Sequence, residues 1–164
     1  SNYDKATTER AVKILKELHC PFVVNQVRYS IFDRHIEENG VKDFCKEAGV
    51  GIIAFSPLAQ GLLKDKYLHG IPEDSRIARD HRFLKESALT PERLSQIRQL
   101  NELAKGRGQS LAQMALSWIL KDDKVCSVLI GASKPEQIVE NLSIVENTVF
   151  TEEEIRTIDR ICEN

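Results

Sequence analysis

A short apolar run passes directly into a polar loop that contains a glycine, and this junction restricts the folds open to the chain more than any other feature. The run is Val50–Phe55 and the loop is Ser56–Leu62. A short apolar run with helical patterns on either side is typical of a buried parallel strand, covered on both faces. Parallel strands carry binding groups just past their carboxyl ends. The junction therefore predicts a ligand site in an α/β fold.

The order of strand, polar loop and helix recurs along the chain. Further strands are expected at residues 22–27 and 125–130, and helices at residues 7–18, 41–48, 91–106, 110–120, 136–145 and 151–161. Strands that alternate with helices indicate βαβ units and a parallel sheet, either an open doubly wound sheet or a piece of a (β/α) barrel. A whole barrel needs eight strands and about 250 residues. Three clear strands in 164 residues fit half of one.

Composition excludes several classes of protein. The formal charge of -2 gives no general attraction to nucleic acid, and no apolar run is long enough to cross a bilayer. The first residues carry no signal-like segment, so we expect a cytosolic protein. The histidines lack metal-ligand spacing, and we expect no metal. The cysteines form no C-x-x-C pair and are expected to be reduced thiols: Cys20, Cys45, Cys126 and Cys162.

Residues 61–90 form a long, strongly charged stretch with little apolar periodicity. Loops of this length in compact domains are often lids or binding loops, with disorder as the competing explanation. Both readings stay open for this segment.

Several ordered motifs resemble the C-terminal half of the aldo-keto reductases, closest to the branch with bacterial glyceraldehyde-3-phosphate reductases and potassium channel beta subunits. The motifs are residues 1–3, 25–26, 55–62, 70–76, 112–118 and 129–141. The resemblance covers nearly the whole chain. It implies one domain, residues 1–164, that is the C-terminal half of a (β/α)8 TIM barrel, with covering helices and a long loop after strand seven. The N-terminal half is absent from this chain.

The resemblance also implies a nicotinamide cofactor and the residues that hold it. Ser1, Asn2 and Gln26 match residues that hydrogen-bond the nicotinamide carboxamide, and Phe55 matches an aromatic ring stacked on the nicotinamide. The pyrophosphate loop corresponds to Ser56, Pro57, Leu58, Ala59, Gln60 and Gly61, with positive charge from Lys66 and Arg76. The adenosine end corresponds to Gly131, Ser133, Lys134, Gln137, Glu140 and Asn141.

Each of these residues also has a plain structural explanation. Phe55 can be a core aromatic, Gln26 can cap a strand end, and Ser133 with Lys134 can cap a helix. What favours a binding role is that all of them fall at or after the carboxyl ends of expected parallel strands.

The resemblance implies an NADP(H)-dependent oxidoreductase that reduces aldehydes or ketones to alcohols, with a small carbonyl compound as substrate. NAD(H) stays open, because Gln137 stands where some members have Arg. The catalytic Tyr, Lys, Asp and His of the family lie in the other half, so no catalytic residue is assigned and this chain alone is expected to be inactive. Tyr29 is expected to line the substrate opening.

Two other functions stay open. The chain could be a nucleotide-binding regulatory module resembling the channel beta subunits. An open sheet edge could also lead to self-association, or to pairing with the missing N-terminal half.

Overall fold

The structure of the protein, a computed structural model, describes residues 1–68 and 86–163. The chain forms two compact units. Unit 1 contains Ser1–Pro57 and Ile119–Gly131, and unit 2 contains Leu58–Trp118 and Ala132–Asn164. Each unit is described by itself below.

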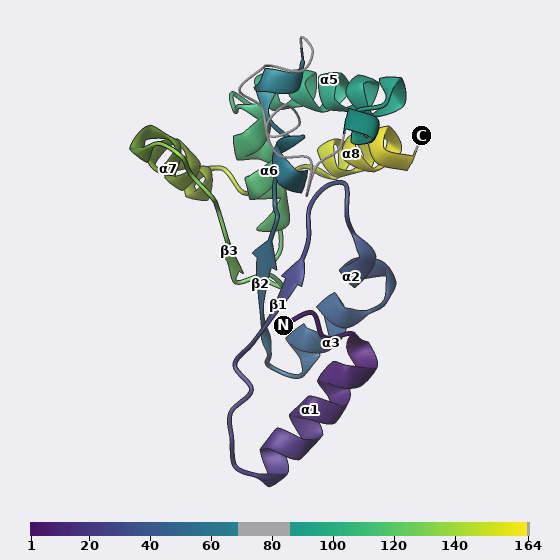
Figure 1. Cartoon of the computed structure of the whole chain (residues 1–164), viewed down its shortest axis with the longest axis vertical. Helices are drawn as coiled ribbons and strands as arrows, with labels where there is room; N and C mark the ends of the chain where they lie inside the picture. Colours follow the sequence, from purple (N-terminus) through teal and green to yellow (C-terminus); the bar gives the residue numbers. More distant parts are fainter. Residues whose placement is uncertain (69–85, 164) are drawn as a thin grey trace. The chain divides into compact units, whose positions relative to one another are not determined.

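Unit 1 contains a three-stranded parallel sheet (Figure 1). Its strands are β1 (Val24–Arg28), β2 (Gly51–Phe55) and β3 (Ser127–Val128), in the order β1-β2-β3. Its helices are α1 (Lys5–Glu17), α2 (His35–Glu38) and α3 (Val41–Glu47). All three expected strands are present and parallel, which confirms the α/β class. The third strand is shorter than expected, although Cys126 and Leu129 extend its pairing through backbone bonds to Ile52 and Ala54.

The two faces of this sheet differ in burial. Alternate residues of β1 and β2 are fully buried: Asn25, Val27, Ile52 and Ala54. Helix α3 packs against β2, and α1 packs against α3. The intervening residues are exposed or half-buried, and we call their side of the sheet the open face: Val24, Gln26 and Arg28 of β1 with Gly51, Ile53 and Phe55 of β2. Because strand side chains alternate, each of these residues has a fixed side of the sheet.

Helix α1 begins earlier than the sequence predicts. A threonine cap at Thr7 or Thr8 is expected, but the side chain of Asp4 is the cap and accepts a hydrogen bond from the backbone N–H of Thr7 at 2.7 Å. Thr8 is buried instead, and its hydroxyl donates to the Asp4 carbonyl at 2.7 Å. A carboxylate suits the positive end of a helix dipole, which explains the earlier start.

Unit 2 is mainly helical. Its longer helices are α5 (Pro91–Gly106), α6 (Leu111–Ile119, which ends at the unit boundary), α7 (Pro135–Leu142) and α8 (Glu152–Glu163). Its short 3-10 turns are η1 (Ala59–Gly61), η2 (Asp65–Tyr67), η3 (Glu86–Ala88) and η4 (Ser143–Glu146). Helix α7 is shorter than the expected 136–145, because η4 replaces its last turn.

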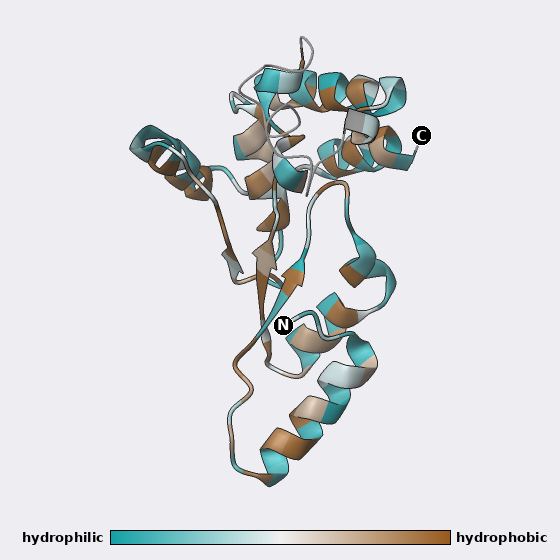
Figure 2. Cartoon of the chain, in the orientation of Figure 1, coloured by the Kyte–Doolittle hydropathy of each residue, from teal (hydrophilic) through white to brown (hydrophobic). Residues whose placement is uncertain are grey.

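Helix caps and core residues of unit 2 follow the sequence closely. Thr90 caps α5 by accepting from the Arg93 N–H, and Thr151 and Glu154 form the reciprocal capping box expected before α8. The residues of α6 expected in the core are confirmed as buried: Leu111, Met114 and Trp118. Hydrophobic residues of α7 are by contrast exposed (Figure 2), Val139 and Leu142 among them.

Membrane-spanning helices and metal-binding clusters are both absent from the described residues. In residues 1–68 and 86–163, no helix is long and apolar enough to cross a membrane. No group of three or more histidine, cysteine or acidic side chains in that part of the chain is arranged to hold a metal ion.

Candidate functional site

The N-terminal residues lie beside the end of β1. The backbone N–H of Asn2 donates to the Gln26 carbonyl at 2.8 Å, and the Ser1 hydroxyl donates to the same oxygen at 3.1 Å. The amide of Asn25, on the opposite side of β1, holds Tyr3 by donating to its carbonyl at 3.0 Å. Ser1 and Asn2 are therefore fixed next to Gln26, as the sequence-based assignment of these three residues requires.

Gln26 and Phe55 share the open face of the sheet. They occupy half-buried positions on β1 and β2, and Gln26 is in register with Ile53, two residues before Phe55. Neighbouring strands are about 4.8 Å apart, and residues two apart on a strand point the same way. The open face thus carries a polar amide and an aromatic ring close to the carboxyl ends of two adjacent strands.

Left-handed backbone conformations concentrate at the predicted site. Among the described residues other than glycine, those with positive φ are Asn2, His19, Ser56, Ala59 and Gln60. All except His19 are residues that the sequence assigns to cofactor binding. Such conformations are costly for residues with a side chain and cluster at binding sites, where surrounding structure enforces them.

The predicted pyrophosphate loop crosses from unit 1 into unit 2. Ser56 and Pro57 belong to unit 1, whereas Leu58 begins unit 2 and leads into the tight turn η1. The turn is closed by the Gly61 N–H, which donates to the Leu58 carbonyl at 2.8 Å, and the φ of 98° at Gly61 favours glycine. Ala59 and Gln60 form the turn between them and are half-buried.

Of the two basic residues assigned to this loop, the structure describes only Lys66. Lys66 lies in η2 with its ammonium nitrogen 5.1 Å from the centre of the Tyr67 ring. Arg76 lies outside the described residues, as does most of the charged stretch at residues 61–90, for which a lid or binding loop and disorder both stay open.

The predicted adenosine segment surrounds the start of α7. Lys134 is the N-cap residue of α7 and Pro135 occupies its first turn. The side-chain oxygen of Gln137 accepts from the Ser133 N–H at 2.9 Å and from its hydroxyl at 3.3 Å. The exposed amino end of α7 therefore offers positive charge and backbone N–H groups suited to an anion.

The rest of this segment is used partly for packing. Glu140 accepts from the Ser110 hydroxyl at 3.3 Å, and its carbonyl accepts from the Gln113 side chain at 3.2 Å. Asn141 is half-buried, and Gly131 is an exposed residue at the end of unit 1. The residues assigned to the nicotinamide thus lie together in unit 1, and those assigned to the adenosine end lie in unit 2 except Gly131.

A buried ionic cluster in unit 1 was not expected from the sequence. Its members are Tyr29, Glu37, Lys42, Lys121 and Asp122. The Tyr29 hydroxyl donates to Glu37 and accepts from Lys42 and Lys121, each at 3.0 Å. Lys42 also donates to Asp122 at 2.8 Å and to Glu37 at 3.1 Å. Tyr29 is completely buried, so the expectation that it lines a substrate opening is wrong.

Electrostatics inside this cluster oppose acid catalysis by Tyr29. Burial, and then the negative charge of Glu37, raise the pKa of the Tyr29 phenol above its ordinary value. Burial, followed by repulsion from Lys42, lowers the pKa of Lys121 to about 8. The buried Tyr29 phenol is therefore poorly suited to donate a proton at neutral pH.

Sequence reasoning missed three residues at the edge of the open face. Arg28 ends β1 two residues after Gln26, and its Nε lies 2.5 Å from an Asp33 oxygen. The second Asp33 oxygen lies 2.6 Å from Nδ1 of His35. The alternation of β1 could have revealed Arg28, because Gln26 and Arg28 share a face in any regular strand.

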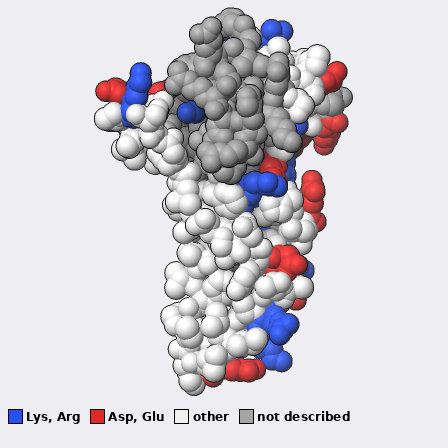
Figure 3. All heavy atoms as spheres, viewed as in Figure 1, with Lys and Arg blue, Asp and Glu red and all other residues white. Residues whose placement is uncertain are grey.

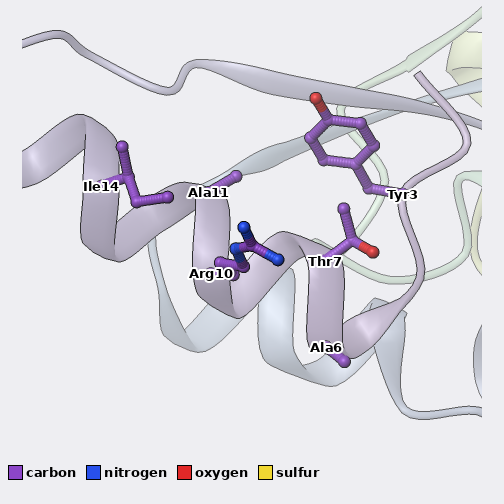
Figure 4. Close-up of a pocket in the computed structure, with 6 residues that line it drawn as sticks. All are labelled: Tyr3, Ala6, Thr7, Arg10, Ala11 and Ile14. Carbon is purple, nitrogen blue, oxygen red and sulfur yellow. The ribbon is translucent and has the colours of Figure 1, made fainter.

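A shallow groove in unit 1 lies away from these residues. Tyr3 and α1 line it, with Arg10, Ala11 and Ile14 along the helix (Figure 4). None of the predicted site residues contributes to it. Charged side chains gather on the side of unit 1 where α1, α2 and α3 lie (Figure 3).

Comparison with known sequences identifies relatives over the full length of the chain. The model of the aldo/keto reductase family matches residues 1–163. The L-glyceraldehyde 3-phosphate reductase of Escherichia coli K12 is 47% identical over 163 residues, which are 98% of this chain and 47% of that protein. A Schizosaccharomyces pombe protein named as a voltage-gated potassium channel subunit beta is 38% identical, over 85% of this chain and 42% of its own length.

Solved structures agree in fold. The glycerol dehydrogenase of Gluconobacter oxydans superimposes with a TM-score of 0.75 at 26% identity, over 98% of this chain and 46% of that one. A thermostable aldo-keto reductase in complex with the inhibitor epalrestat gives a TM-score of 0.69 at 29% identity, with the same coverage of 98% and 46%. The chain therefore spans about half the length of the relatives it matches. Its α/β fold corresponds to a portion of their barrel.

Proposed function

Because the chain belongs to the aldo/keto reductase family, we propose that it is the cofactor-binding part of a cytosolic, NADP(H)-dependent oxidoreductase that reduces a small aldehyde or ketone to an alcohol. The observation that supports this most is the pair of hydrogen bonds from Ser1 and Asn2 to the Gln26 carbonyl. They hold the ends of two chain segments together beside the open face, where Phe55 also lies. The identity of 47% to a glyceraldehyde-phosphate reductase supports the same class of reaction.

The residues of the site fit a nicotinamide cofactor. The side chain of Gln26 has both a donor and an acceptor, which a carboxamide group needs from its partner. The half-buried ring of Phe55 has an apolar face for a flat heterocycle. When bound, such a cofactor supplies the hydride. The residues of this chain orient it.

Phosphate groups would be held by the loop after β2 and by the start of α7. The enforced left-handed conformations at Ser56, Ala59 and Gln60 turn the backbone sharply where a pyrophosphate is expected. Ser133 and Lys134 stand at the exposed amino end of α7 and suit the additional phosphate of NADP(H). Lys66 and Arg76 supply further positive charge in this proposal.

The proton required by the alcohol product comes from outside this chain. Tyr29 directly follows Arg28, the last residue of β1 on the open face. Its phenol is already hydrogen-bonded to Glu37, Lys42 and Lys121. Its raised pKa also works against proton donation. We therefore expect residues 1–164 alone to be inactive.

The test compares the full-length protein that contains this chain with residues 1–164 in isolation. NADPH oxidation is followed with small aldehydes, at equal protein concentration. We expect turnover only by the full-length protein. Normal turnover by the isolated chain would contradict the assignment of proton donation to the other part.

A second candidate is a nucleotide-binding regulatory subunit. The identity of 38% to a protein named as a potassium channel beta subunit favours it. A full-length protein that binds NADPH tightly but oxidises it with none of a panel of aldehydes would support regulation over catalysis.

The open face also requires an explanation in this proposal. It carries half-exposed Val24 and Ile53 beside the outer edge of β1, against which no further strand of the described residues pairs, and such surfaces favour association. We propose that it pairs with the rest of the barrel in the full-length protein, or with a second copy when the chain is isolated. Size-exclusion chromatography of residues 1–164 tests this, since a folded monomer at high concentration would argue against self-association.

A further inference from the structure

We propose that Arg28 is the residue that selects carbonyl substrates bearing a phosphate group, an inference that depends on the proposed reductase function. Arg28 is the last residue of β1 and points to the open face, on the same side as Gln26. It is in direct register with Phe55 on β2. The arginine thus stands at the carboxyl edge of the sheet, beside the ring that we assign to the nicotinamide.

Arg28 is held in place and is not a freely moving surface cation. Its Nε contacts an Asp33 oxygen at 2.5 Å. Asp33 is itself fixed by a tight turn, because its backbone N–H donates to the Ser30 carbonyl at 3.1 Å and its carbonyl accepts from the Ser30 N–H at 3.0 Å. Ser30 is buried, so the turn is anchored in unit 1. This anchoring reduces the conformational entropy that Arg28 would lose on binding a ligand.

The remaining nitrogens of Arg28 suit a phosphate. The guanidinium group is planar and has five N–H donors, and Asp33 contacts it at Nε as an ion pair. The side chain is 59% exposed, and the described residues provide no hydrogen-bond partner for its two terminal nitrogens. A planar pair of such nitrogens binds phosphate oxygens in a bidentate manner.

The spacing fits a small phosphorylated aldehyde. Gln26 and Arg28 are separated by two strand residues, which is about 7 Å along β1. In a three-carbon aldehyde phosphate, two carbons and an oxygen separate the carbonyl carbon from the phosphorus. A carbonyl group placed over the nicotinamide near Phe55 can therefore extend its phosphate toward Arg28.

Asp33 and His35 complete the local charges. The Asp33 carboxylate repels an anion, but one of its oxygens faces Arg28 and the other lies 2.6 Å from Nδ1 of His35. Both oxygens thus face nitrogen atoms of basic side chains. We therefore assign Asp33 as a positioning residue that orients the arginine.

The experiment measures kcat/KM of the full-length protein for glyceraldehyde 3-phosphate and for glyceraldehyde, with NADPH. We expect Arg28→Met to lower the ratio of the two values by tenfold to a hundredfold, and Arg28→Lys to lower it less, because lysine keeps the charge but loses the planar pair of donors. Arg10→Met is the matched control, since it removes an equal charge from α1, in the groove of Figure 4. It should leave the ratio unchanged.

Inorganic phosphate provides a second readout that does not require a phosphorylated substrate. It should inhibit glyceraldehyde reduction competitively in the unmodified protein and in Arg10→Met, and much more weakly in Arg28→Met. If Arg28→Met lowers kcat/KM equally for both substrates, or leaves the inhibition by phosphate unchanged, the role of Arg28 is overturned while the reductase function stays intact. If the unmodified protein reduces neither aldehyde, the proposed function itself fails.

Discussion

Arg28 and Phe55 are directly paired in the register of the two adjacent parallel strands β1 and β2. Both residues lie on the open face, and both stand at the carboxyl ends of their strands. An aromatic ring and a cation at neighbouring positions give this edge of the sheet two different binding properties. The ring suits a flat heterocycle, and the cation suits an anion bound beside it.

Replacing Phe55 should weaken cofactor binding. Phe55→Ala removes the flat apolar face on which we place the nicotinamide, and loss of an aromatic contact costs about 1 kcal/mol beyond the area lost, or roughly fivefold in affinity. Phe55→Tyr keeps the ring and is the control. Fluorescence titration of the full-length protein with NADPH measures both, and an unchanged dissociation constant for Phe55→Ala would remove the ring from the cofactor site.

Replacing Ser133 and Lys134 together should reduce the preference for NADPH over NADH. The variant Ser133→Ala, Lys134→Met removes a hydroxyl and a charge from the exposed start of α7, where we place the phosphate that distinguishes the two cofactors. A contact to phosphate by a charged group contributes about 1.5–3 kcal/mol, or roughly tenfold to a hundredfold. Titration with each cofactor measures the ratio of the dissociation constants for NADH and NADPH. A parallel loss for NADH and NADPH would contradict this assignment.

The positions of the strands and of most helices could be predicted from the sequence because their signals are local. Pro91 after Thr90, and Glu154 three residues after Thr151, define helix starts through contacts within one turn. The predicted start of α1 was wrong, because Asp4 caps the helix before the apolar pattern begins.

The candidate site was predictable only in part. Gln26 and Phe55 could be placed near strand ends from their apolar runs and given a role from the family resemblance, but the left-handed backbone at Ser56 and Ala59 has no signature in residue type. The position of Tyr29 depends on Lys121, which is distant in sequence. Only the fold brings these two residues together, so the sequence could not show that Tyr29 is buried.

Removing Lys42 should destabilise the protein strongly. Its side chain is 4% exposed and pairs with both Glu37 and Asp122, so Lys42→Ala leaves two partly buried carboxylates without this partner. Breaking a buried ion pair on one side costs about 3–5 kcal/mol. Lys46→Ala is the control, because Lys46 pairs with Asp123 at the surface, where an ion pair contributes little. Urea unfolding followed by circular dichroism measures the unfolding free energy of both variants. An equal decrease in the two variants would contradict a special role for the buried cluster.

Lys121 should make stability rise with pH in the alkaline range. Its pKa is lowered to about 8 in the folded chain from an ordinary value of 10.5, so between these values the unfolded chain binds more protons than the folded chain. Folding is then favoured as pH rises, by about 1 kcal/mol per pH unit for one proton. Below pH 8 both states are protonated, and the unfavourable burial of the charge is fully present.

The measurement compares the unmodified protein with Lys121→Met in urea unfolding from pH 7 to pH 10. Only the unmodified protein should gain stability from this group, so the difference in unfolding free energy between the two proteins should change with pH. Parallel curves for the two proteins would show that Lys121 titrates normally.

A side chain at Gly51 should destabilise the protein, because β2 begins in a crowded place. A Cβ atom at this position would lie 3.0 Å from the Cys126 sulfur, 3.2 Å from a methyl carbon of Val24 and 3.4 Å from the Val23 carbonyl oxygen. The Gly51 N–H also donates to that carbonyl at 2.9 Å, so the backbone cannot move away without losing the bond. Overpacking of this kind costs about 1–3 kcal/mol. Gly51→Ala should therefore lower the unfolding free energy by this amount.

Gly106→Ala is the opposite case and serves as the control. A Cβ atom on Gly106 meets no other atom within 4 Å, and the residue lies in the last turn of α5. Alanine favours a helix over glycine by up to about 1 kcal/mol, so this variant should be slightly more stable than the unmodified chain. The thermal unfolding midpoints of the two variants should shift in opposite directions from that of the unmodified protein. If Gly51→Ala is as stable as Gly106→Ala, the close approach of β1, β2 and the segment before β3 is not a constraint on the fold.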